Sequence, residues 1–497
     1  MKSRMRIWST AAALVAVLTV SVGMAAQDNP SPNHHRHHTY TLVDLGTFGG
    51  PNSYPIITES VQTLSQNGVV GGCAETTEGN PKFPNFNPFL FPPPGPDPLI
   101  AHTFQWRNGL LTDLGALPGT NTSCALWISG NGLIAGASET GATDPLAGFP
   151  AAQAVLWRNN SLVSLGTLGG YESFAISVND RGQAVGASTN TIPEDNGLGD
   201  QLHATLWENG RIRDLGTLPG GTDSFAVVVN DRGQVMGAST ASPQPGSIFF
   251  WENGVMRAIP NTIGGTGENP FFMNNRAMIL GNAGIAGDIA FHPFIWYRGV
   301  MTDIGTFGGD NGDAVWVNEL GQVVGTADLP GDVMHHAYLW QRGHKADLAP
   351  LPGDLCSTAL AINESGQVVG RSSDCTNGVA SIWENGRVAD LNQLVEPGSG
   401  LNLIRAWNIN DRGEIVGEAL LDNGDEHAFL LKPHGDCDYR CEQRLAEHPR
   451  DRMAAAQLAR PQTLATKTQA PVTSAERVRN LLRQRFGLTG PNPALRD

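Results

Sequence analysis

The chain has 497 residues, of which 60 are glycine and 32 proline, and only 16% of the residues are charged. This composition is typical of a turn-rich globular β-protein and excludes a disordered or a mainly helical chain. The formal net charge of −15 argues against nucleic-acid binding, which needs a basic surface, and we expect no nucleic-acid partner.

Residues 1–25 have the pattern of a secretory signal peptide. Three basic residues precede an apolar run that ends at Val22, and Gly23 and Ala25 place small residues before the expected cleavage site. We expect an extracellular or periplasmic protein whose signal peptide is cleaved. An uncleaved membrane anchor is the alternative, and no later stretch is apolar for long enough to span a bilayer.

Residues 26–39 form a short polar segment with a cluster of histidines. A flexible histidine tract can bind zinc, copper or nickel weakly. We instead expect a solvated arm, with no metal site and no cofactor in the protein. The histidines are His34, His35, His37 and His38.

Residues 40–433 repeat one pattern with a period near 45 residues. The clearest copy runs from Leu165 to Trp207 and contains a glycine-rich loop, an apolar stretch that ends in Val-Asn, a tight turn and a second apolar stretch. A period of this length with several short strands in each unit predicts a β-propeller.

Each unit contains four predicted strands. In the clearest copy they cover residues 173–179, 183–188, 203–207 and 211–215, and their β-branched and apolar content supports the assignment. The turns Asn-Asp-Arg-Gly and Glu-Asn-Gly recur between the first two and the last two strands, so these pairs should form tight hairpins.

The two ends of the repeat region indicate how the ring closes. Tyr40–Leu45 resembles a fourth strand with no earlier partners, and His427–Leu431 resembles a third strand with no fourth strand after it. The N-terminal strand should therefore complete the last blade and remove the open edges. We expect eight blades. The unit around Phe271–Trp296 is the most degenerate, so seven blades plus an irregular unit is the alternative.

The recurring strings resemble those of a known group of repeat proteins. His-Ala-Phe-Leu at 427–430, Asp-Leu-Gly-Thr-Leu at 214–218 and Ile-Asn-Asp-Arg-Gly at 409–413 are similar to the repeats of the HAF-repeat family of probable extracellular proteins. The resemblance implies a repeat fold and an exported protein, and it implies no particular activity.

Two residue types recur at fixed positions of the unit. Tryptophan ends the third strand, where we expect it to contact the neighbouring blade rather than to form a ligand platform. A histidine often stands four residues earlier, and for this we predict a structural His–Asp–Ser network inside each blade rather than a metal site or a hydrolase triad. In the clearest unit the three residues are His203, Asp214 and Ser173.

Six cysteines in an exported chain suggest disulfides. Cys356 and Cys375 lie at the far ends of one predicted hairpin. Cys73 and Cys124 occupy similar places in neighbouring units, and Cys437 and Cys441 remain for each other. Free thiols are the alternative.

The connections between the second and third strands vary most among the units. Binding usually involves variable loops on a rigid scaffold, so we expect a ligand site on this face and at the mouth of the central channel. One loop, residues 83–94, is rich in phenylalanine and proline and either forms an exposed contact surface or folds back over the blades. Another loop adds an acidic rim. The candidate ligand-binding residues are Phe86, Phe89, Phe91, Glu194, Asp195 and Asp200.

These observations favour a secreted, non-enzymatic binding scaffold for an unknown protein or glycan. The alternative is an extracellular carbohydrate-active hydrolase or lyase that uses acidic residues near the channel. We assign no catalytic residue, and we expect a monomer.

Residues 434–497 differ from the repeats and should form a linker and a basic helical tail. The tail has 11 basic and 7 acidic residues, and residues 474–486 have the pattern of an amphipathic helix. If the protein contacts a membrane, we expect this helix to make the contact. Docking on the acidic propeller is the alternative.

Overall fold

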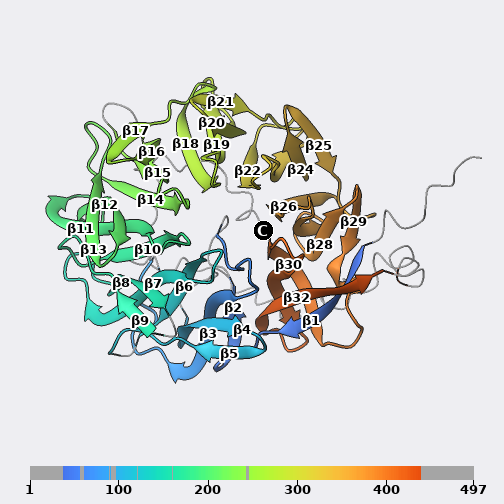
Figure 1. Ribbon diagram of the computed structural model, residues 1–497, viewed down its shortest axis with the longest axis horizontal. Coiled ribbons are helices and arrows are strands. Elements are labelled where there is room, and N and C mark those ends of the chain that lie inside the picture. Colours follow the sequence, from blue (N-terminus) through green and yellow to red (C-terminus); the bar gives the residue numbers. More distant parts are fainter. Residues whose placement is uncertain are drawn as a thin grey trace, which may run out of the picture. The chain divides into compact units, whose positions relative to one another are not determined.

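The computed structural model describes residues 37–55, 61–88, 90, 97–119, 121–158, 161–241, 246–437 and 441. They form eight antiparallel sheets of four strands that succeed one another around a central axis (Figure 1). The protein is therefore an eight-bladed β-propeller, as the repeat predicted. The degenerate fifth unit forms a four-stranded blade like the others.

The first seven blades each use four consecutive strands. Blade 1 contains β2 (Gly49–Tyr54), β3 (Val70–Gly79), β4 (Leu99–Arg107) and β5 (Leu110–Asp113), and blade 2 contains β6 (Ser123–Ile128), β7 (Ile134–Thr143), β8 (Pro150–Arg158) and β9 (Ser161–Ser164). Blade 3 contains β10 (Ser173–Val178), β11 (Ala184–Glu194), β12 (Gly199–Glu208) and β13 (Arg211–Gly216), and blade 4 contains β14 (Ser224–Val229), β15 (Val235–Ser239), β16 (Ser247–Glu252) and β17 (Val255–Ala258). Blade 5 contains β18 (Gly264–Met273), β19 (Ile279–Ile285), β20 (Phe291–Tyr297) and β21 (Val300–Asp303). Blade 6 contains β22 (Gly312–Val317), β23 (Val323–Asp328), β24 (His335–Gln341) and β25 (His344–Leu348), and blade 7 contains β26 (Cys356–Ile362), β27 (Val368–Ser373), β28 (Gly378–Glu384) and β29 (Arg387–Asp390).

Blade 8 joins the two ends of the repeat region. It contains β30 (Leu401–Ile409), β31 (Ile415–Leu421) and β32 (Glu426–Asp436), and its outer strand is β1 (His38–Asp44). Figure 1 shows β1, in blue, beside the orange-red β32, and Leu42 lies opposite Leu431 in this pair. The predicted closure by the N-terminal strand is confirmed.

Burial falls from the axis to the rim of each blade. Every residue of β6 is buried, whereas three of the four residues of β9 in the same blade are exposed. An inner strand lies between two neighbouring blades and is covered on both faces. For this reason inner strands such as β6 and β10 are buried along almost their whole length rather than at every second residue.

Each second strand contains one glycine at the point where the backbone of the inner strand comes too close to leave room for a side chain. The inner strand has a bulge beside it, between Ala175 and Ser177 in blade 3. A Cβ atom on Gly186 would collide with the carbonyl oxygen of Phe174. The same collision with inner-strand backbone would occur in the other blades, at Gly72, Gly136, Gly237, Gly281, Gly325, Gly370 and Gly417. This explains the recurring Val-Gly and similar pairs of the repeat.

The histidine–aspartate half of the predicted network is confirmed. His203 Nδ1 lies 2.9 Å from an Asp214 carboxylate oxygen, between the third and fourth strands of blade 3. The other four pairs are His102–Asp113, His292–Asp303, His336–Asp347 and His427–Asp44.

The serine half of that prediction is wrong, because the serine joins neighbouring blades instead. The Ser173 hydroxyl accepts the N–H of Ala154 in the preceding blade at 2.9 Å and donates to the carbonyl of Gly166 at 2.9 Å. Ser224 makes the same two contacts one blade later, to Ala204 and Gly216. The side chain therefore fastens the inner strand of one blade to the third strand of the blade before it.

A second set of side chains links the blades at the tight turns. The Asn179 side-chain amide donates to the carbonyl of Asn230 at 2.8 Å, and the N–H of Asp180 donates to the Asp231 carboxylate at 2.9 Å. The amide contact recurs from Asn230 through Asn274, Asn318, Asn363 and Asn410 to Ser65. The asparagine and aspartate of the Asn-Asp-Arg-Gly turns are thus structural.

The recurring tryptophans contact the preceding blade. Trp157 of blade 2 donates its indole N–H to the carbonyl of Leu114 in the segment that follows blade 1. Trp383 of blade 7 donates in the same way to Ala349, which follows blade 6. These tryptophans therefore take part in contacts between blades rather than in an aromatic ligand platform.

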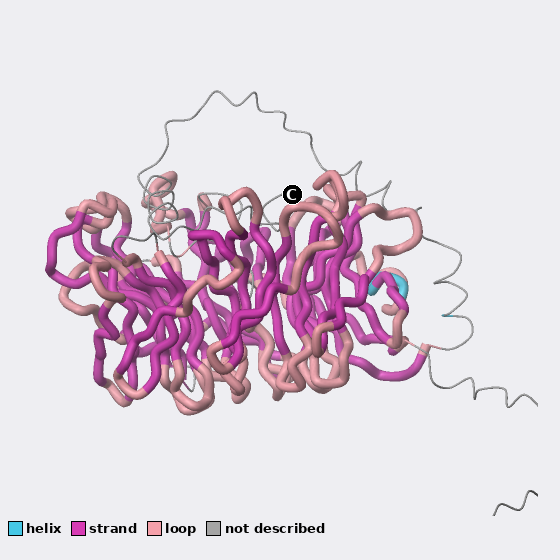
Figure 2. Tube along the Cα trace, turned by 90° about the horizontal axis from the view of Figure 1, so that it is seen from above, coloured by secondary structure: helices cyan, strands magenta, loops and turns pink. Residues whose placement is uncertain are grey.

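The strands run between two faces that carry the connections (Figure 2). We call the "turn face" the side with the tight turns, such as 179–182 and 208–211. We call the "loop face" the side with the connections between second and third strands and between blades, such as 195–198 and 217–223. In the part of the chain that the structure describes, no helix is long and apolar enough to cross a membrane.

Three disulfides join the six cysteines, in the pairs suggested by the sequence. Cys73 and Cys124 connect blades 1 and 2, and Cys356 and Cys375 connect the two ends of one hairpin. Cys437 and Cys441 form the third bond, beside the start of β1, where the N–H of Cys437 donates to the carbonyl of His37. The disulfides indicate an oxidising compartment.

We expect the Cys73–Cys124 bond to stabilise the ring strongly. Replacing both cysteines by alanine should lower the free energy of unfolding by about 2–5 kcal/mol, because the bond closes a loop of 51 residues. The same change at Cys437 and Cys441 should cost less, because these residues are separated by 4 positions. Chemical denaturation of the two variants and the wild type compares these costs, and equal costs would contradict the expectation.

The His427–Asp44 pair should make ring closure sensitive to pH. The hydrogen bond with Asp44 raises the pKa of His427. Burial favours a higher pKa for Asp44, but its hydrogen bonds with His427 and the Gly46 N–H outweigh burial and lower it. The pair therefore stabilises the fold fully between the ordinary pKa of aspartate, about 3.9, and that of histidine, about 6.5. This stabilisation is lost as the pH rises through the raised pKa of His427.

His427→Gln should accordingly destabilise the protein by about 0.2–1 kcal/mol near pH 5.5 and by less near pH 8.5. Thermal unfolding at both pH values measures the difference. The control is His344→Gln, an exposed position on β25. A loss for His427→Gln that stays constant with pH would show that the charged pair does not stabilise the closure.

Candidate functional site

The loop face is built up most over the first three blades. The second strands β3, β7 and β11 contain 10, 10 and 11 residues, whereas β15 of blade 4 contains 5. In these three blades the second and third strands continue beyond the sheet as two-stranded ribbons. For example, Glu194 pairs with Gly199 at the tip of the blade 3 ribbon. The ribbons place their connecting loops above the rest of the ring.

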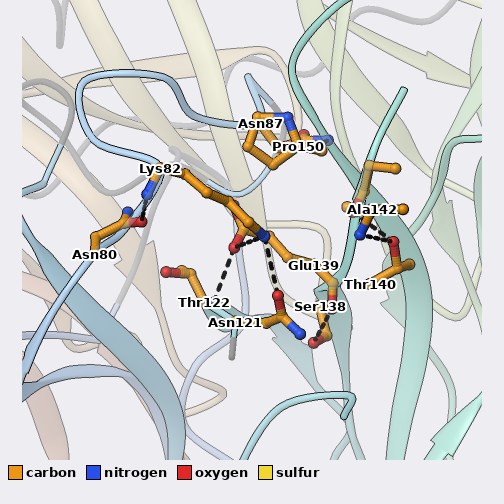
Figure 3. A network of polar contacts seen from close by, with 12 residues as sticks. Asn80, Lys82, Asn87, Asn121, Thr122, Ser138, Glu139, Thr140, Ala142 and Pro150 are labelled. Carbon is orange, nitrogen blue, oxygen red and sulfur yellow. Dashed lines mark hydrogen bonds and ion pairs between the residues drawn. The ribbon is translucent and has the colours of Figure 1, made fainter. Parts of the chain in front are cut away.

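The described part of the phenylalanine- and proline-rich loop crosses from blade 1 onto blade 2. Lys82 Nζ lies 3.2 Å from Glu139 Oε2 and 3.0 Å from Asn121 Oδ1, and Figure 3 shows this group with Asn87 and Pro150 nearby. The Asn87 side-chain amide donates to the Pro150 carbonyl at 2.8 Å. These contacts anchor the loop to its neighbour.

One of the two described phenylalanines of this loop is turned inwards. Phe86 is 8% exposed, and Leu90 is buried in an apolar cluster with Cys124, Phe149 and Leu198. The described part of the loop therefore combines the two arrangements expected from the sequence: Phe86 and Leu90 fold back over the blades, whereas Phe83, at 47% exposed, faces solvent. Phe89 and Phe91 lie outside the described residues.

The three acidic candidates of the blade 3 ribbon lie in different environments. Asp195 is exposed at the loop, Glu194 is half-buried, and Asp200 is buried. Burial and the negative charge of Asp144 raise the pKa of Asp200. Because Asp200 is buried and Asp195 is exposed, these residues do not present one common acidic rim to solvent.

The sequence analysis missed a pair of inter-blade clamps on this face. Asn196 Nδ2 donates to the Asp200 carbonyl and to Asp223 Oδ1, both at 2.8 Å, and the N–H of Leu202 also donates to Asp223. Asp223 directly precedes the serine of blade 4. The clamp therefore holds the tip of the blade 3 ribbon against the next blade.

The second clamp has the same form but takes its asparagine from a different blade. Asn87 Nδ2 donates to Glu172 Oε2 at 2.8 Å, and the N–H of Ala152 donates to the same oxygen at 3.1 Å. Asn87 comes from the blade 1 loop, although the clamp joins blades 2 and 3. The sequence signal was an acidic residue directly before the serine, as in Glu172-Ser173 and Asp223-Ser224.

A buried carboxyl group, Glu75, and the partly exposed Asp97 lie on the loop face of blade 1. Glu75 is 2% exposed and accepts hydrogen bonds from the Asn52 side chain, at 2.8 Å and 3.0 Å. Burial raises the pKa of Glu75 to about 7, and the adjacent Asp97 carboxyl acts in the same direction. Burial therefore favours the protonated form of Glu75 over a wider pH range than for an exposed glutamate.

Large apolar side chains fill the space near the axis. The rings of Trp127 and Phe272, from blades 2 and 5, are stacked with centroids 6.1 Å apart, although these blades are not neighbours in the ring. Phe272 also stacks on Trp316 of blade 6 at 4.0 Å. Val61 and Trp407 belong to the same cluster. The axis is therefore a hydrophobic core at this level.

Metal-binding side chains do not gather in the described part of the chain. Within its residues, no group of three or more histidine, cysteine, aspartate or glutamate side chains is arranged to hold a metal ion by itself. His37 and His38 lie against the Glu384 carboxylate, with the Nδ1 of His38 3.2 Å from it. His34 and His35 lie outside the described residues.

The outer surface of the loop face carries exposed apolar side chains. Of the described large apolar residues with high exposure, seven lie on this face, and four of these are on the loops of blades 1–3. The seven are Phe83, Leu146, Tyr171, Ile192, Ile289, Val333 and Leu355. A Cβ atom on Gly199 would lie 2.7 Å from Leu146 Cβ, so the loop of blade 2 rests on the ribbon of blade 3.

Comparisons with known proteins give structural similarity without a family. No protein-family model matches the chain, and no curated protein matches it. Similar solved structures include oligogalacturonate lyase from Vibrio parahaemolyticus, with a TM-score of 0.41, 9% identity and coverage of 80% of this chain and 94% of that chain. The β-propeller domain of the Trilobed protease from Pyrococcus furiosus has a TM-score of 0.38, 10% identity and coverage of 62% and 93%. Trypanosoma rangeli sialidase in complex with sialic acid has a TM-score of 0.32, 8% identity and coverage of 80% and 57%. Similarities at this level decide nothing about a ligand or a reaction.

The raised pKa of Glu75 leads to a prediction about pH and stability. A carboxyl whose pKa is higher in the folded protein destabilises the fold progressively as pH rises from its ordinary pKa of 4.5 to about 7. Glu75→Gln removes this group, so the stability of the variant relative to the wild type should improve between about pH 5 and pH 8. Thermal unfolding at both pH values measures this change.

Glu78→Gln is the matched control, because Glu78 lies at the exposed end of the same strand. Its effect on the unfolding temperature should not change with pH. If Glu75→Gln also shows no change with pH, Glu75 does not hold a proton in the folded protein.

Proposed function

We propose that this protein is an exported, non-enzymatic scaffold that binds a protein or glycan ligand through its loop face. The observation that carries the proposal is that four exposed large apolar side chains lie on the loops of blades 1–3, namely Phe83, Leu146, Tyr171 and Ile192. We call this set of residues the "crest". Exposed apolar groups that lie together on a folded surface typically mark an interaction site.

The chemistry of the crest suits both kinds of ligand. Tyrosine offers a large rigid surface with a polar end, and aromatic residues are enriched where proteins recognise partners. Asp195 on the blade 3 ribbon is also exposed on this face. The turn face contrasts with this surface, because its asparagine and acidic side chains are engaged between the blades.

The acidic residues support binding over hydrolysis. Glu172 and Asp223 accept hydrogen bonds from backbone N–H groups and asparagines within inter-blade clamps, and Glu139 is paired with Lys82. A glycosidase needs two carboxyl groups that flank a substrate. These three carboxyl groups instead hold loops and blades together.

Export is the second part of the proposal. The disulfides support an oxidising compartment. The signal-peptide pattern of residues 1–25 and the resemblance to HAF-repeat proteins point in the same direction. We further propose that the exported protein is a monomer and that any membrane contact involves residues 474–486.

The crest should be required for binding. The mature protein is screened by thermal unfolding against neutral, acidic and amino-sugar polysaccharides. A ligand that binds only the folded state should add about 2.7 kcal/mol at a hundred times its dissociation constant. For a ligand found in this way, Tyr171→Ala combined with Ile192→Ser should weaken binding at least about tenfold, which corresponds to about 1.4 kcal/mol.

The matched control is Val163→Ser on the outer strand β9. Val163 is 49% exposed, close to the 48% of Tyr171, but it lies away from the crest. If no polysaccharide shifts the unfolding temperature, a photo-crosslinker at position 192 should capture a protein partner that the same crosslinker at position 163 does not. Equal binding by the crest variant, or equal crosslinking from both positions, would contradict the proposal.

A further inference from the structure

A lysine, an asparagine and a glutamate from three separate segments meet on the loop face between blades 1 and 2. Lys82 lies on the blade 1 loop, Asn121 just before β6, and Glu139 within β7. The ammonium nitrogen Nζ of Lys82 is 3.0 Å from Asn121 Oδ1 and 3.2 Å from Glu139 Oε2, as Figure 3 shows. One amine therefore contacts both a carboxamide and a carboxylate.

These groups are largely removed from water. Asn121 is 2% exposed, and the side chains of Glu139 and Lys82 are 4% and 20% exposed. Burial penalises the charged ammonium and carboxylate but not the neutral amine and carboxylic acid that a proton transfer between them produces. A neutral amine is a nucleophile, and here it would form beside a carboxylic acid that can return the proton.

The carboxamide of Asn121 is held in one orientation. Its Nδ2 atom donates to the backbone carbonyls of Leu117 and Pro118, at 3.0 Å and 3.3 Å. Carbonyl oxygens can only accept hydrogen bonds, so these contacts fix which end of the amide is nitrogen. The Oδ1 atom therefore faces the Lys82 amine, and the amide carbon lies one covalent bond behind it.

The other two groups are also held in place by the backbone. The N–H of Lys82 donates to Asn80 Oδ1 at 3.0 Å. The N–H of Thr122 donates to Glu139 Oε2 at 3.1 Å, and the N–H of Glu139 donates to the Thr122 carbonyl at 2.9 Å. Reactants fixed in contact do not pay the entropy of a bimolecular encounter, so a slow reaction between them is strongly accelerated.

We propose that Lys82 and Asn121 form an intramolecular isopeptide bond, with Glu139 as the proton carrier. Glu139 takes a proton from the ammonium group, and the freed Nζ attacks the amide carbon of Asn121. The new Nζ–Cγ bond forms and the Cγ–Nδ2 bond breaks. Of the three protons of the lysine ammonium group, one stays on the new amide and two pass by way of Glu139 to the former amide nitrogen, which leaves as ammonium. No oxidant or reductant is needed.

The bond would tie the loop of blade 1 to blade 2. It joins residues 39 positions apart, inside the segment of 51 positions that the Cys73–Cys124 disulfide also closes. Unlike the disulfide, an isopeptide bond is not broken by reduction. It would hold the start of the loop that carries Phe83, but it forms whether or not the loop face binds a ligand.

Lys345 provides the internal comparison. It is also partly buried, but its Nζ atom donates to the backbone carbonyls of Gly305 and Thr306. These contacts offer no side-chain amide whose nitrogen can leave as ammonia. We therefore expect a bond at Lys82 and none at Lys345.

The experiment is mass spectrometry of the mature protein after reduction and denaturation. The mass should be lower than that of the sequence by one ammonia molecule, about 17 Da. Digestion with trypsin should give one branched peptide that joins the segments containing Lys82 and Asn121 and is uncut after Lys82. A wild type with its full mass and no branched peptide would overturn the proposal.

Three variants assign the roles. Lys82→Arg keeps the positive charge but should have the full mass, and Glu139→Gln keeps a hydrogen-bond acceptor but should also lack the branched peptide. Lys345→Arg is the control and should keep both the lower mass and the branched peptide. A lower mass that persists in Lys82→Arg would show that ammonia is lost elsewhere in the chain, and complete cross-linking in Glu139→Gln would show that Glu139 carries no proton. Each of these results would contradict the proposed reaction.

Discussion

The pairing of β1 with β32 is the constraint on which the rest of the ring depends. Each blade is covered on both faces by its neighbours, so the apolar inner strands stay dry only if the ring has no open end. The backbone pairing from His38 to Asp44 supplies the fourth strand of blade 8, and Ser53 then fastens blade 1 to the third strand of blade 8. Because the first and last strands of the repeat region meet here, every blade is stabilised by contacts that close over almost the full length of the propeller.

Hydrogen bonds from side chains to the backbone also link neighbouring blades around the ring. In five blades a serine such as Ser173 or Ser224 holds the inner strand to the blade before it, and the asparagines of the turns link neighbouring blades on the other face. Polar residues that resemble catalytic or metal-binding groups are therefore engaged in assembly. In blade 5 the serine is replaced by Glu268, whose carboxylate accepts the N–H of Ile248. In this blade an acidic side chain therefore makes the inter-blade contact that a serine hydroxyl makes elsewhere.

The two faces of the ring consequently have different roles. The turn face is constrained by a nearly continuous circuit of hydrogen bonds, so its sequence has little freedom to vary. The loop face is held by separate side-chain clamps, such as Asn196 with Asp223 and Asn87 with Glu172, and its loops also touch one another, as Leu146 does at Gly199. Exposed apolar residues, interlocked loops and buried carboxyl groups meet over blades 1–3. This is where the scaffold can acquire a ligand without disturbing the assembly of the blades.

The sequence by itself determined the architecture, because strand periodicity and turn chemistry are local. The Asn-Asp-Arg-Gly turns, the recurring tryptophans and the unpaired strands at both ends predicted eight closed blades, and the spacing of His203 and Asp214 predicted their contact. Only the tertiary structure decided the partners of residues far apart in the chain. Ser173 turned out to bind the preceding blade, and Asn87 crosses from blade 1 to complete a clamp with Glu172, 85 positions later. No local pattern contains these contacts, because they arise from the ring geometry and from loops that reach over a neighbouring blade.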